Sequence, residues 1–205
     1  MSVELKQPFI QISRHYTPLP DQGDGRIRLL VKRKEDGEMS RYVMALPAGA
    51  EVNVRGEYAE WELPKEEGAR VVFLVGGTGI APALQGADKV LAKDGEARVR
   101  ILWAVRWPEE TGGKVREMLE GLEKKFDGRL EVGMYVDSEK PLAKEVVEES
   151  VKAWGAKDVV VCGPDGFIAY WAGKKEWVGG EQLQGPLGGV VGALVKGQPV
   201  KVFKL

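Results

Sequence analysis

Two glycine-containing stretches each follow a strand-like apolar run and lead into a helical pattern, and the first of them suits an anionic ligand. It consists of Gly76, Gly77, Thr78 and Gly79 and continues to Pro82. Glycine lets the backbone approach a ligand closely, and the start of a helix directs free N–H groups and a positive dipole end towards a phosphate. A plain tight turn would need similar residues, and the stretch lacks the spaced G-x-G-x-x-G of a standard dinucleotide fold. We therefore expect either a nucleotide-binding loop or a turn here.

The second stretch consists of Cys162, Gly163 and Pro164. A small thiol followed by glycine and proline leaves room for a flat ring beside the end of a strand. A lone cysteine is more often a small buried apolar residue. A thiol nucleophile would need an activating base, and His15 is the only imidazole in the sequence. We therefore favour a ring-binding role over thiol catalysis.

Polar and aromatic residues in the first third of the sequence suit a flat, phosphorylated cofactor. Arg14 can pair with a pyrophosphate, the face of Tyr16 can stack on a ring, and the hydroxyl of Thr17 can bond a ring heteroatom. Ser40, which follows Gly37 at a predicted helix start, can bind a phosphate or simply cap the helix. Taken singly, each of these residues is more often structural, so their order along the chain carries the information.

Two kinds of structure have to position these residues. The first third reads as β structure with a short helix at residues 40–45, and its expected strands are residues 9–16, 26–32 and 51–56. From residue 70 onwards, strand-like apolar runs alternate with helical patterns, which is typical of a doubly wound parallel sheet. The expected strands of this part are residues 71–75, 98–104, 130–135, 158–162 and 199–203, and the helices are residues 80–92, 113–126, 140–154 and 165–175.

The predicted fold class is a parallel doubly wound α/β domain with strand order 3-2-1-4-5, preceded by a partial antiparallel β-barrel. A charged stretch at residues 64–68 separates the two parts, so we expect domains at residues 1–66 and 67–205. In a doubly wound sheet, ligands bind at the carboxyl ends of the strands. Both glycine-containing stretches follow predicted strands at that edge.

Composition excludes several other classes of protein. The chain has 205 residues and a net charge of −1 with acidic and basic residues interleaved, which offers no electrostatic footprint for nucleic acid or an anionic membrane. One cysteine and one histidine exclude a disulfide framework and a Cys- or His-cluster metal site. The longest apolar run is too short to span a bilayer, and residues 1–7 show no signal-peptide pattern. We expect no metal, no nucleic-acid partner and no membrane contact by this chain.

In this order, the four motifs resemble the ferredoxin–NADP reductase superfamily, most closely its cytochrome b5 reductase branch. They are R-x-Y-[ST]-P, G-x-M-S, G-G-T-G-I-x-P and C-G-P, and the similarity runs over essentially the whole chain. Residues 2–8 and 185–189 look like the fungal mitochondrial FAD-binding FR-type oxidoreductases that are linked to haem attachment on cytochrome c.

The resemblance implies two sets of cofactor-binding residues. Those on the FAD side are Arg14, Tyr16, Thr17, Val31, Lys32, Gly37, Met39 and Ser40. Those on the nicotinamide side are Gly76, Gly77, Thr78, Gly79, Pro82, Cys162, Gly163 and Pro164. Thr17, Thr78 and Cys162 would be the catalytic residues beside the reacting rings. Asp137 would bind the adenosine ribose and favour NADH over NADPH, because a carboxylate repels a 2′-phosphate.

The function implied by the resemblance is an FAD-dependent oxidoreductase of electron transport, which takes hydride from NADH and passes electrons to a haem protein such as a cytochrome. The implied location is mitochondrial, at the inner membrane or in the intermembrane space. The family's barrel has six strands, but only 13 residues precede Arg14. The N-terminal part of the barrel is therefore expected to be missing, together with any anchor. The alternative is a truncated, non-catalytic dinucleotide-binding or assembly module that cannot retain FAD.

Overall fold

The computed structural model describes residues 1–6 and 12–205, and the chain forms two units, Met1–Glu62 and Leu63–Leu205. The division into functional domains between residues 66 and 67 stays a prediction. Within the described residues, no helix combines the length and the apolar character that crossing a bilayer requires.

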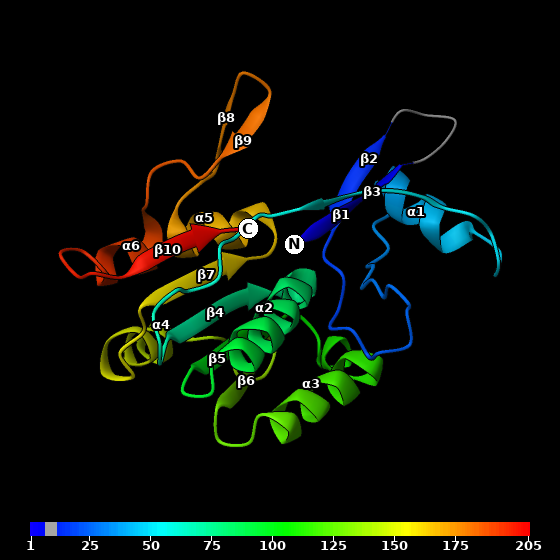
Figure 1. Ribbon diagram of the computed structural model, residues 1–205. Helices are drawn as coiled ribbons and strands as arrows, with labels where there is room; N and C mark the ends of the chain where they lie inside the picture. The colour runs from blue at the N-terminus through cyan, green and yellow to red at the C-terminus, as the bar shows by residue number, and fades with distance from the viewer. Residues whose placement is uncertain (7–11) are drawn as a thin grey trace. The chain divides into compact units, whose positions relative to one another are not determined.

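The first unit contains a three-stranded antiparallel sheet with the order β2-β1-β3 (Figure 1). Its strands are β1 Ser2–Lys6, β2 Ser13–Tyr16 and β3 Asn53–Tyr58, and its helix is α1 Glu38–Ala45. Val3 and Leu5 of β1 are 6% and 3% exposed and share one face of the sheet, as the alternation of a strand requires. The sequence analysis missed β1, and residues 9–11 of the predicted strand at 9–16 lie outside the described residues.

The predicted strand at residues 26–32 is wrong. This segment makes an isolated bridge from Leu29 to Pro18, and the N–H of Leu19 donates to the carbonyl oxygen of Arg28 at 2.8 Å. Pro18 and Pro20, which lie on the opposite side of the bridge, have no N–H group to continue a ladder. The pairing therefore stops at a single bridge, and Ile27 is 65% exposed.

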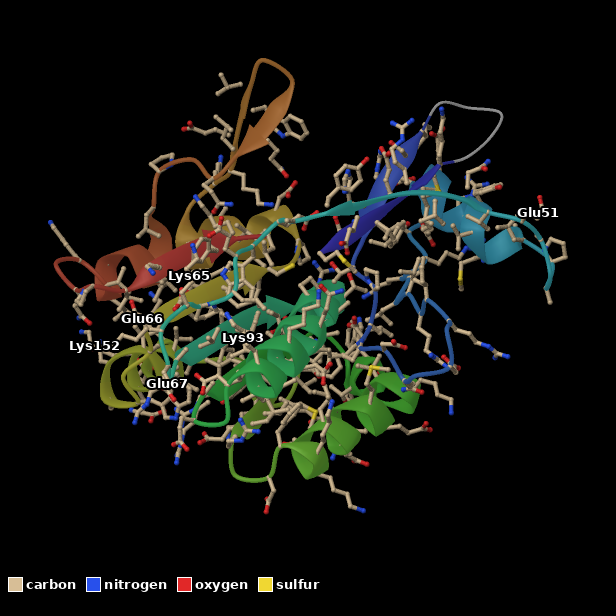
Figure 2. All side chains as sticks on the ribbon, in the orientation of Figure 1. Glu51, Lys65, Glu66, Glu67, Lys93 and Lys152 are labelled. Carbon is tan, nitrogen blue, oxygen red and sulfur yellow. The ribbon has the colours of Figure 1, made fainter. Side chains whose placement is uncertain are left out.

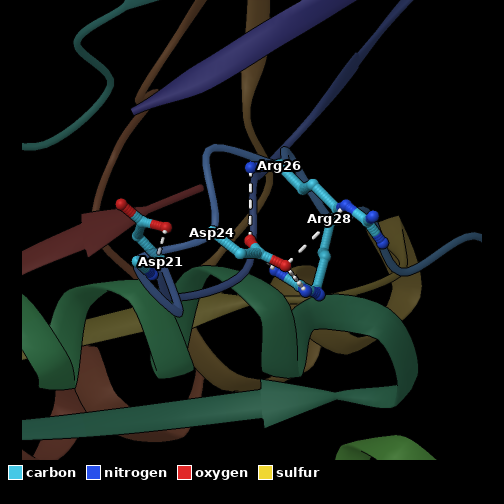
Figure 3. A network of polar contacts seen from close by, with 5 residues as sticks. Asp21, Asp24, Arg26 and Arg28 are labelled. Carbon is cyan, nitrogen blue, oxygen red and sulfur yellow. Dashed lines mark hydrogen bonds and ion pairs between the residues drawn. The ribbon is translucent and has the colours of Figure 1, made fainter.

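The turn before this segment is held by carboxylates (Figure 3). Asp24 accepts the backbone N–H of Arg26 at 3.2 Å and a guanidinium N–H of Arg28 at 3.0 Å. Asp21 accepts the N–H of Gly23 at 2.9 Å. The hydrogen bond from Arg28 lowers the pKa of the Asp24 carboxyl from its ordinary value. These contacts fix the chain direction between Pro20 and residues 26–32.

The second unit contains a five-stranded parallel sheet with the order β10-β7-β4-β5-β6 (Figure 1). Numbered along the unit, this order is 3-2-1-4-5, so the predicted fold class is confirmed. The strands are β4 Arg70–Gly76, β5 Arg98–Val105, β6 Leu130–Val136, β7 Asp158–Cys162 and β10 Lys201–Lys204. The five apolar residues at 71–75 are all 0% exposed, because helices cover both faces of the sheet.

The helices of this unit agree largely with the predicted ranges. They are the 3₁₀ turns Gly77–Gly79 and Pro108–Thr111, and the helices α2 Ile80–Lys93, α3 Gly113–Lys125, α4 Lys144–Glu148, α5 Asp165–Ala172 and α6 Gly189–Leu194. A π-helical stretch, Glu149–Ala153, continues α4. The sequence analysis did not predict α6.

A β-hairpin of β8 Glu176–Val178 and β9 Glu181–Leu183 was also missed. Its base is fixed by Lys204, which is 3% exposed. The ammonium of Lys204 donates to the carbonyl oxygens of Lys174 at 3.1 Å, Gly185 at 3.3 Å and Pro186 at 3.1 Å. The side-chain amide of Gln184 pairs with the backbone N–H and C=O of Lys204 at 2.7 and 2.8 Å. The hairpin is therefore tied to the edge strand β10.

The segment that enters β4 carries Lys65, Glu66 and Glu67, and Lys93 at the end of α2 lies beside it (Figure 2). The ammonium of Lys93 donates to the carbonyl oxygen of Pro64 at 3.1 Å. The N–H of Gly68 donates to the carboxylate of Asp94 at 2.8 Å, so the end of α2 holds the charged stretch at both of its ends.

Candidate functional site

The two glycine-containing loops of the second unit lie against each other. β4 and β7 are parallel neighbours, and their register pairs Val75 with Cys162. A Cβ atom on Gly79 would lie 2.6 Å from the carbonyl oxygen of Cys162, and one on Gly163 would lie 3.1 Å from the backbone nitrogen of Gly76. Backbone atoms cannot yield to such contacts as a flexible side chain can. The packing of one loop on the other therefore requires glycine at positions 79 and 163.

Phe167 completes this contact, and the sequence analysis did not include it in the site. Its ring on α5 would lie 3.0 Å from a Cβ atom on Gly76 and 3.1 Å from one on Gly163. The ring therefore covers the α-carbons of both loops. Its position five residues after Cys162 was the only available signal.

The centre of the first loop is open. Gly77 has φ +54°, a Cβ atom there would meet nothing within 4 Å, and the neighbouring Thr78 is exposed. No side chain caps the 3₁₀ turn at Gly76 or α2 at Gly79 among the described residues. The first N–H groups of a helical turn have no acceptor within that turn. An anionic group can therefore bind them here, so the loop fits the phosphates of a dinucleotide.

Pro82 and Asp137 are placed consistently with this reading. Pro82 lies in the first turn of α2, where its missing N–H costs no helical hydrogen bond. Asp137 directly follows β6, is exposed, and donates its backbone N–H to the carbonyl oxygen of Val105 at 2.9 Å. Asp137 therefore lies at the carboxyl edge of the sheet, next to the end of β5. Its role in ribose binding stays a prediction.

In the first unit, the strand β2 sorts its residues onto two faces. His15 contacts Ser2 at 3.1 Å and Glu60 at 3.7 Å, and its ring lies 4.9 Å from that of Tyr58. Alternation places Arg14 and Tyr16 together on the opposite face. Burial raises the pKa of the half-buried Tyr16, and the nearby Arg14 opposes that rise. Thr17 is half-buried and follows directly.

The turn into α1 is closed by its own hydrogen bonds. The hydroxyl of Ser40 accepts the N–H of Lys34 at 3.0 Å and donates to the carbonyl oxygen of Gly37 at 2.9 Å. A Cβ atom on Gly37 would lie 2.6 Å from that hydroxyl, and Met39 of the same helix is buried. Because Ser40 is engaged with the turn, the uncapped N–H groups at the start of α1 are the groups that fit an FAD phosphate.

Val31 and Lys32 remain the least defined of the predicted FAD contacts. Val31 is half-buried and Lys32 is exposed, and neither lies in a strand. The two sets of predicted residues belong to different units, so the meeting of Thr17 with the Gly77–Gly79 turn stays a prediction. The same holds for the catalytic roles of Thr17, Thr78 and Cys162. Within the described residues, no group of three or more His, Cys, Asp or Glu side chains could hold a metal ion.

Two protein-family models match the chain. Residues 1–63 match the oxidoreductase FAD-binding domain, and residues 73–172 match the oxidoreductase NAD-binding domain. The two matches follow each other along the chain in the order that the motifs indicated.

Curated relatives agree with these models. NADH-cytochrome b5 reductase 2 of Saccharomyces cerevisiae is 26% identical over 180 residues, which cover 80% of this chain and 58% of the relative. The cytochrome c mitochondrial import factor CYC2 of the same species is 34% identical over 79 residues, or 31% of this chain and 22% of that protein. The chain thus spans about three fifths of the length of the first of these relatives.

A solved structure shows the same fold. The cytochrome P450 reductase GcoB of Amycolatopsis superposes with a TM-score of 0.73 at 18% identity, and the match covers 99% of this chain and 59% of that one. At this identity the likeness concerns the fold alone. It extends over both units of the chain.

Proposed function

Because the chain belongs to the ferredoxin–NADP reductase superfamily, we propose that it is an FAD-dependent oxidoreductase that takes hydride from NADH and passes electrons to a haem protein. The FAD-binding and NAD-binding domains indicate FAD and NADH as its cofactors. The observation that carries the proposal is the close contact of the two loops after β4 and β7, with Gly77 and Thr78 left open beside it.

Each predicted residue has a distinct task in this proposal. FAD, when bound, accepts hydride and releases electrons singly, which is chemistry that no side chain of the protein supplies. Arg14 binds the FAD pyrophosphate through its guanidinium group. The start of α1 binds a phosphate of FAD through its free N–H groups. Thr17, Thr78 and Cys162 orient the two rings face to face, so the protein contributes proximity rather than proton transfer.

Coenzyme selection is assigned to the carboxyl edge of the sheet. The exposed carboxylate of Asp137 accepts from the ribose 2′-hydroxyl of NADH and repels the 2′-phosphate of NADPH. Its position directly after β6 supports this assignment.

The acceptor and the location are proposed from the relatives. NADH-cytochrome b5 reductase supports a cytochrome-type haem protein as the acceptor. The cytochrome c mitochondrial import factor supports a mitochondrial location and a link to cytochrome c. Transfer of electrons to purified cytochrome b5 and to cytochrome c, compared side by side, tests which haem protein is used.

The absorbance spectrum of the flavin tests the proposed reduction of FAD by NADH. Purified chain mixed with FAD and then with NADH under anaerobic conditions is expected to lose the flavin absorbance bands. Arg14→Gln should weaken FAD binding by roughly tenfold, the effect of one charge-assisted hydrogen bond. The matched variant Arg26→Gln changes an exposed arginine of the same unit that belongs to the Asp24 turn, and it should bind FAD normally. An unchanged flavin spectrum after NADH addition would rule out the proposal.

A non-catalytic dinucleotide-binding or assembly module is the second candidate. The observation that favours it is the size of the first sheet, which has three strands among the described residues where the family barrel has six. A yellow preparation that FAD can reconstitute supports the enzyme. A colourless one that binds NADH but never FAD supports the module.

A further inference from the structure

Trp103 is buried in the sheet of the second unit, yet its polar atom reaches the nucleotide loop. The residue is 1% exposed and is paired in register with Val75 of β4. Its indole N–H donates to the carbonyl oxygen of Gly77 at 2.9 Å. A buried indole N–H needs an acceptor, and the acceptor here is a backbone group of the loop itself.

The same carbonyl is held from a second side. The backbone N–H of Ile80 also donates to the carbonyl oxygen of Gly77, as part of the 3₁₀ turn Gly77–Gly79. The orientation of the peptide group between Gly77 and Thr78 is therefore fixed by one contact from the sheet and one from the start of α2. Gly77 can adopt its φ of +54° because it has no Cβ atom.

The direction of the Thr78 N–H follows from peptide geometry. In a trans planar peptide the C=O of one residue and the N–H of the next point in opposite directions. The C=O of Gly77 points to a buried indole, so the N–H of Thr78 points away from the core. It points to the side on which Thr78 is exposed and a Cβ atom on Gly77 would meet nothing within 4 Å.

The loop can bind an anion only through its backbone N–H groups and the hydroxyl of Thr78. Residues 75–82 contain no charged side chain. We infer that Trp103 is a positioning residue, which aims the N–H of Thr78 at the phosphate groups of NADH by holding the carbonyl of Gly77. The identity of the ligand in this inference rests on the proposed function. The geometry rests on the hydrogen bond from the indole of Trp103 to the carbonyl oxygen of Gly77.

Trp103→Phe tests the inference, because phenylalanine keeps an aromatic ring in the core and removes the N–H donor. The dissociation constants of NADH and of ADP-ribose should both rise by roughly five- to tenfold, the effect of one misdirected hydrogen bond. The value of kcat with saturating NADH should stay near that of the wild type, while KM rises. ADP-ribose carries the phosphates without the nicotinamide. A higher dissociation constant for NADH with an unchanged dissociation constant for ADP-ribose would therefore overturn the inference.

Trp154→Phe is the matched control for losing an indole. Trp154 is half-buried at the end of the π-helical stretch, and its ring lies 4.9 Å from the guanidinium of Arg100. This variant should lower the melting temperature without changing either dissociation constant. If both variants weakened the binding of ADP-ribose equally, the effect of Trp103→Phe would come from a general loss of stability, and the inference would be wrong.

A measurement without nucleotide separates this inference from the proposed function. In the unliganded wild type, amide hydrogen exchange should show a slowly exchanging indole N–H at Trp103 and a rapidly exchanging N–H at Thr78. A protected Thr78 amide would overturn the inference. If the wild type bound neither NADH nor ADP-ribose, the proposed function would fail, and the exchange rates would still decide how the loop is held.

Discussion

Gly77 and Gly79 stand in the same loop but are glycine for different reasons. Gly77 has a positive φ and open space around it, whereas a Cβ atom on Gly79 would lie 2.6 Å from the carbonyl oxygen and 2.8 Å from the carbonyl carbon of Cys162. The sequence predicted both as ligand-facing glycines. Spacing alone cannot separate the two kinds, because the contact partner lies on a distant strand.

Gly79→Ala should therefore destabilise the fold. The added methyl group forces the loops apart, and we expect the free energy of unfolding to fall by about 2–3 kcal/mol, as is typical of overpacking against rigid atoms. Urea unfolding measures this change, and nucleotide binding should weaken with it. Gly121→Ala, in α3 where a Cβ atom meets nothing within 4 Å, should instead be neutral or stabilising by up to about 1 kcal/mol. Equal effects of the two substitutions would show that loop contact does not explain Gly79.

Asp158 is a buried carboxylate at the start of β7, and it is 6% exposed. Burial raises its pKa, Lys201 on β10 opposes the rise, and Glu66 adds to it. The folded state therefore binds the proton more tightly than the unfolded state. Stability is lost as the pH rises from the ordinary pKa of aspartate, about 4, through the raised value, and the loss is complete above it.

Asp158→Asn should accordingly stabilise the protein at neutral pH by about 1 kcal/mol and bring little gain near pH 3. Thermal unfolding at the two pH values measures the difference. Asp127→Asn, an exposed residue after α3, should change the stability at neither pH. A gain from Asp158→Asn that is as large in acid as at neutral pH would contradict the account.

The sequence predicted those elements of the second unit whose side chains are buried in a regular pattern. The apolar residues at 71–75 form a strand buried on both faces, which a continuous hydrophobic run predicts. The hairpin was missed because Trp177, Val178 and Leu183 are 70%, 57% and 46% exposed and carry no core pattern. The false strand at 26–32 shows the converse error, since an apolar pattern cannot reveal that its partner contains prolines. Trp103 was similarly missed, because in the sequence its indole reads as core.

The hairpin should depend on Lys204 rather than on its own apolar residues. Lys204→Met keeps the length of the side chain and removes the donor to three carbonyl oxygens. Amide exchange in β8 and β9 should become faster by roughly tenfold or more, and a protease should cleave near residues 179–180. Lys201→Met changes an exposed lysine of the same strand and should leave the hairpin protected. Unchanged exchange in Lys204→Met would mean that Gln184 alone holds the hairpin.

At the scale of the whole molecule, the proposed function assigns separate tasks to the two units. Residues 63–205 contain the five-stranded parallel sheet and both glycine-containing loops. Expressed alone, this fragment should fold and bind ADP-ribose with a dissociation constant within about threefold of that of the intact chain, as a domain with its own core would. It should bind no FAD. Calorimetry of ADP-ribose binding tests the first expectation, and an unfolded fragment would show that the second unit needs the first.

The central place of β4 has a consequence for how the protein is made. β4 gains its neighbour β5 soon after synthesis, but its other edge waits for β7, whose Asp158 comes to lie beside Val71. Until then the apolar residues 71–75 of β4 present one unpaired strand edge, which is a condition that favours association with other nascent chains. Such long-range pairing also slows folding. A chain shortened to end before β7 should therefore associate, whereas the full chain, which pairs both edges of β4, should not.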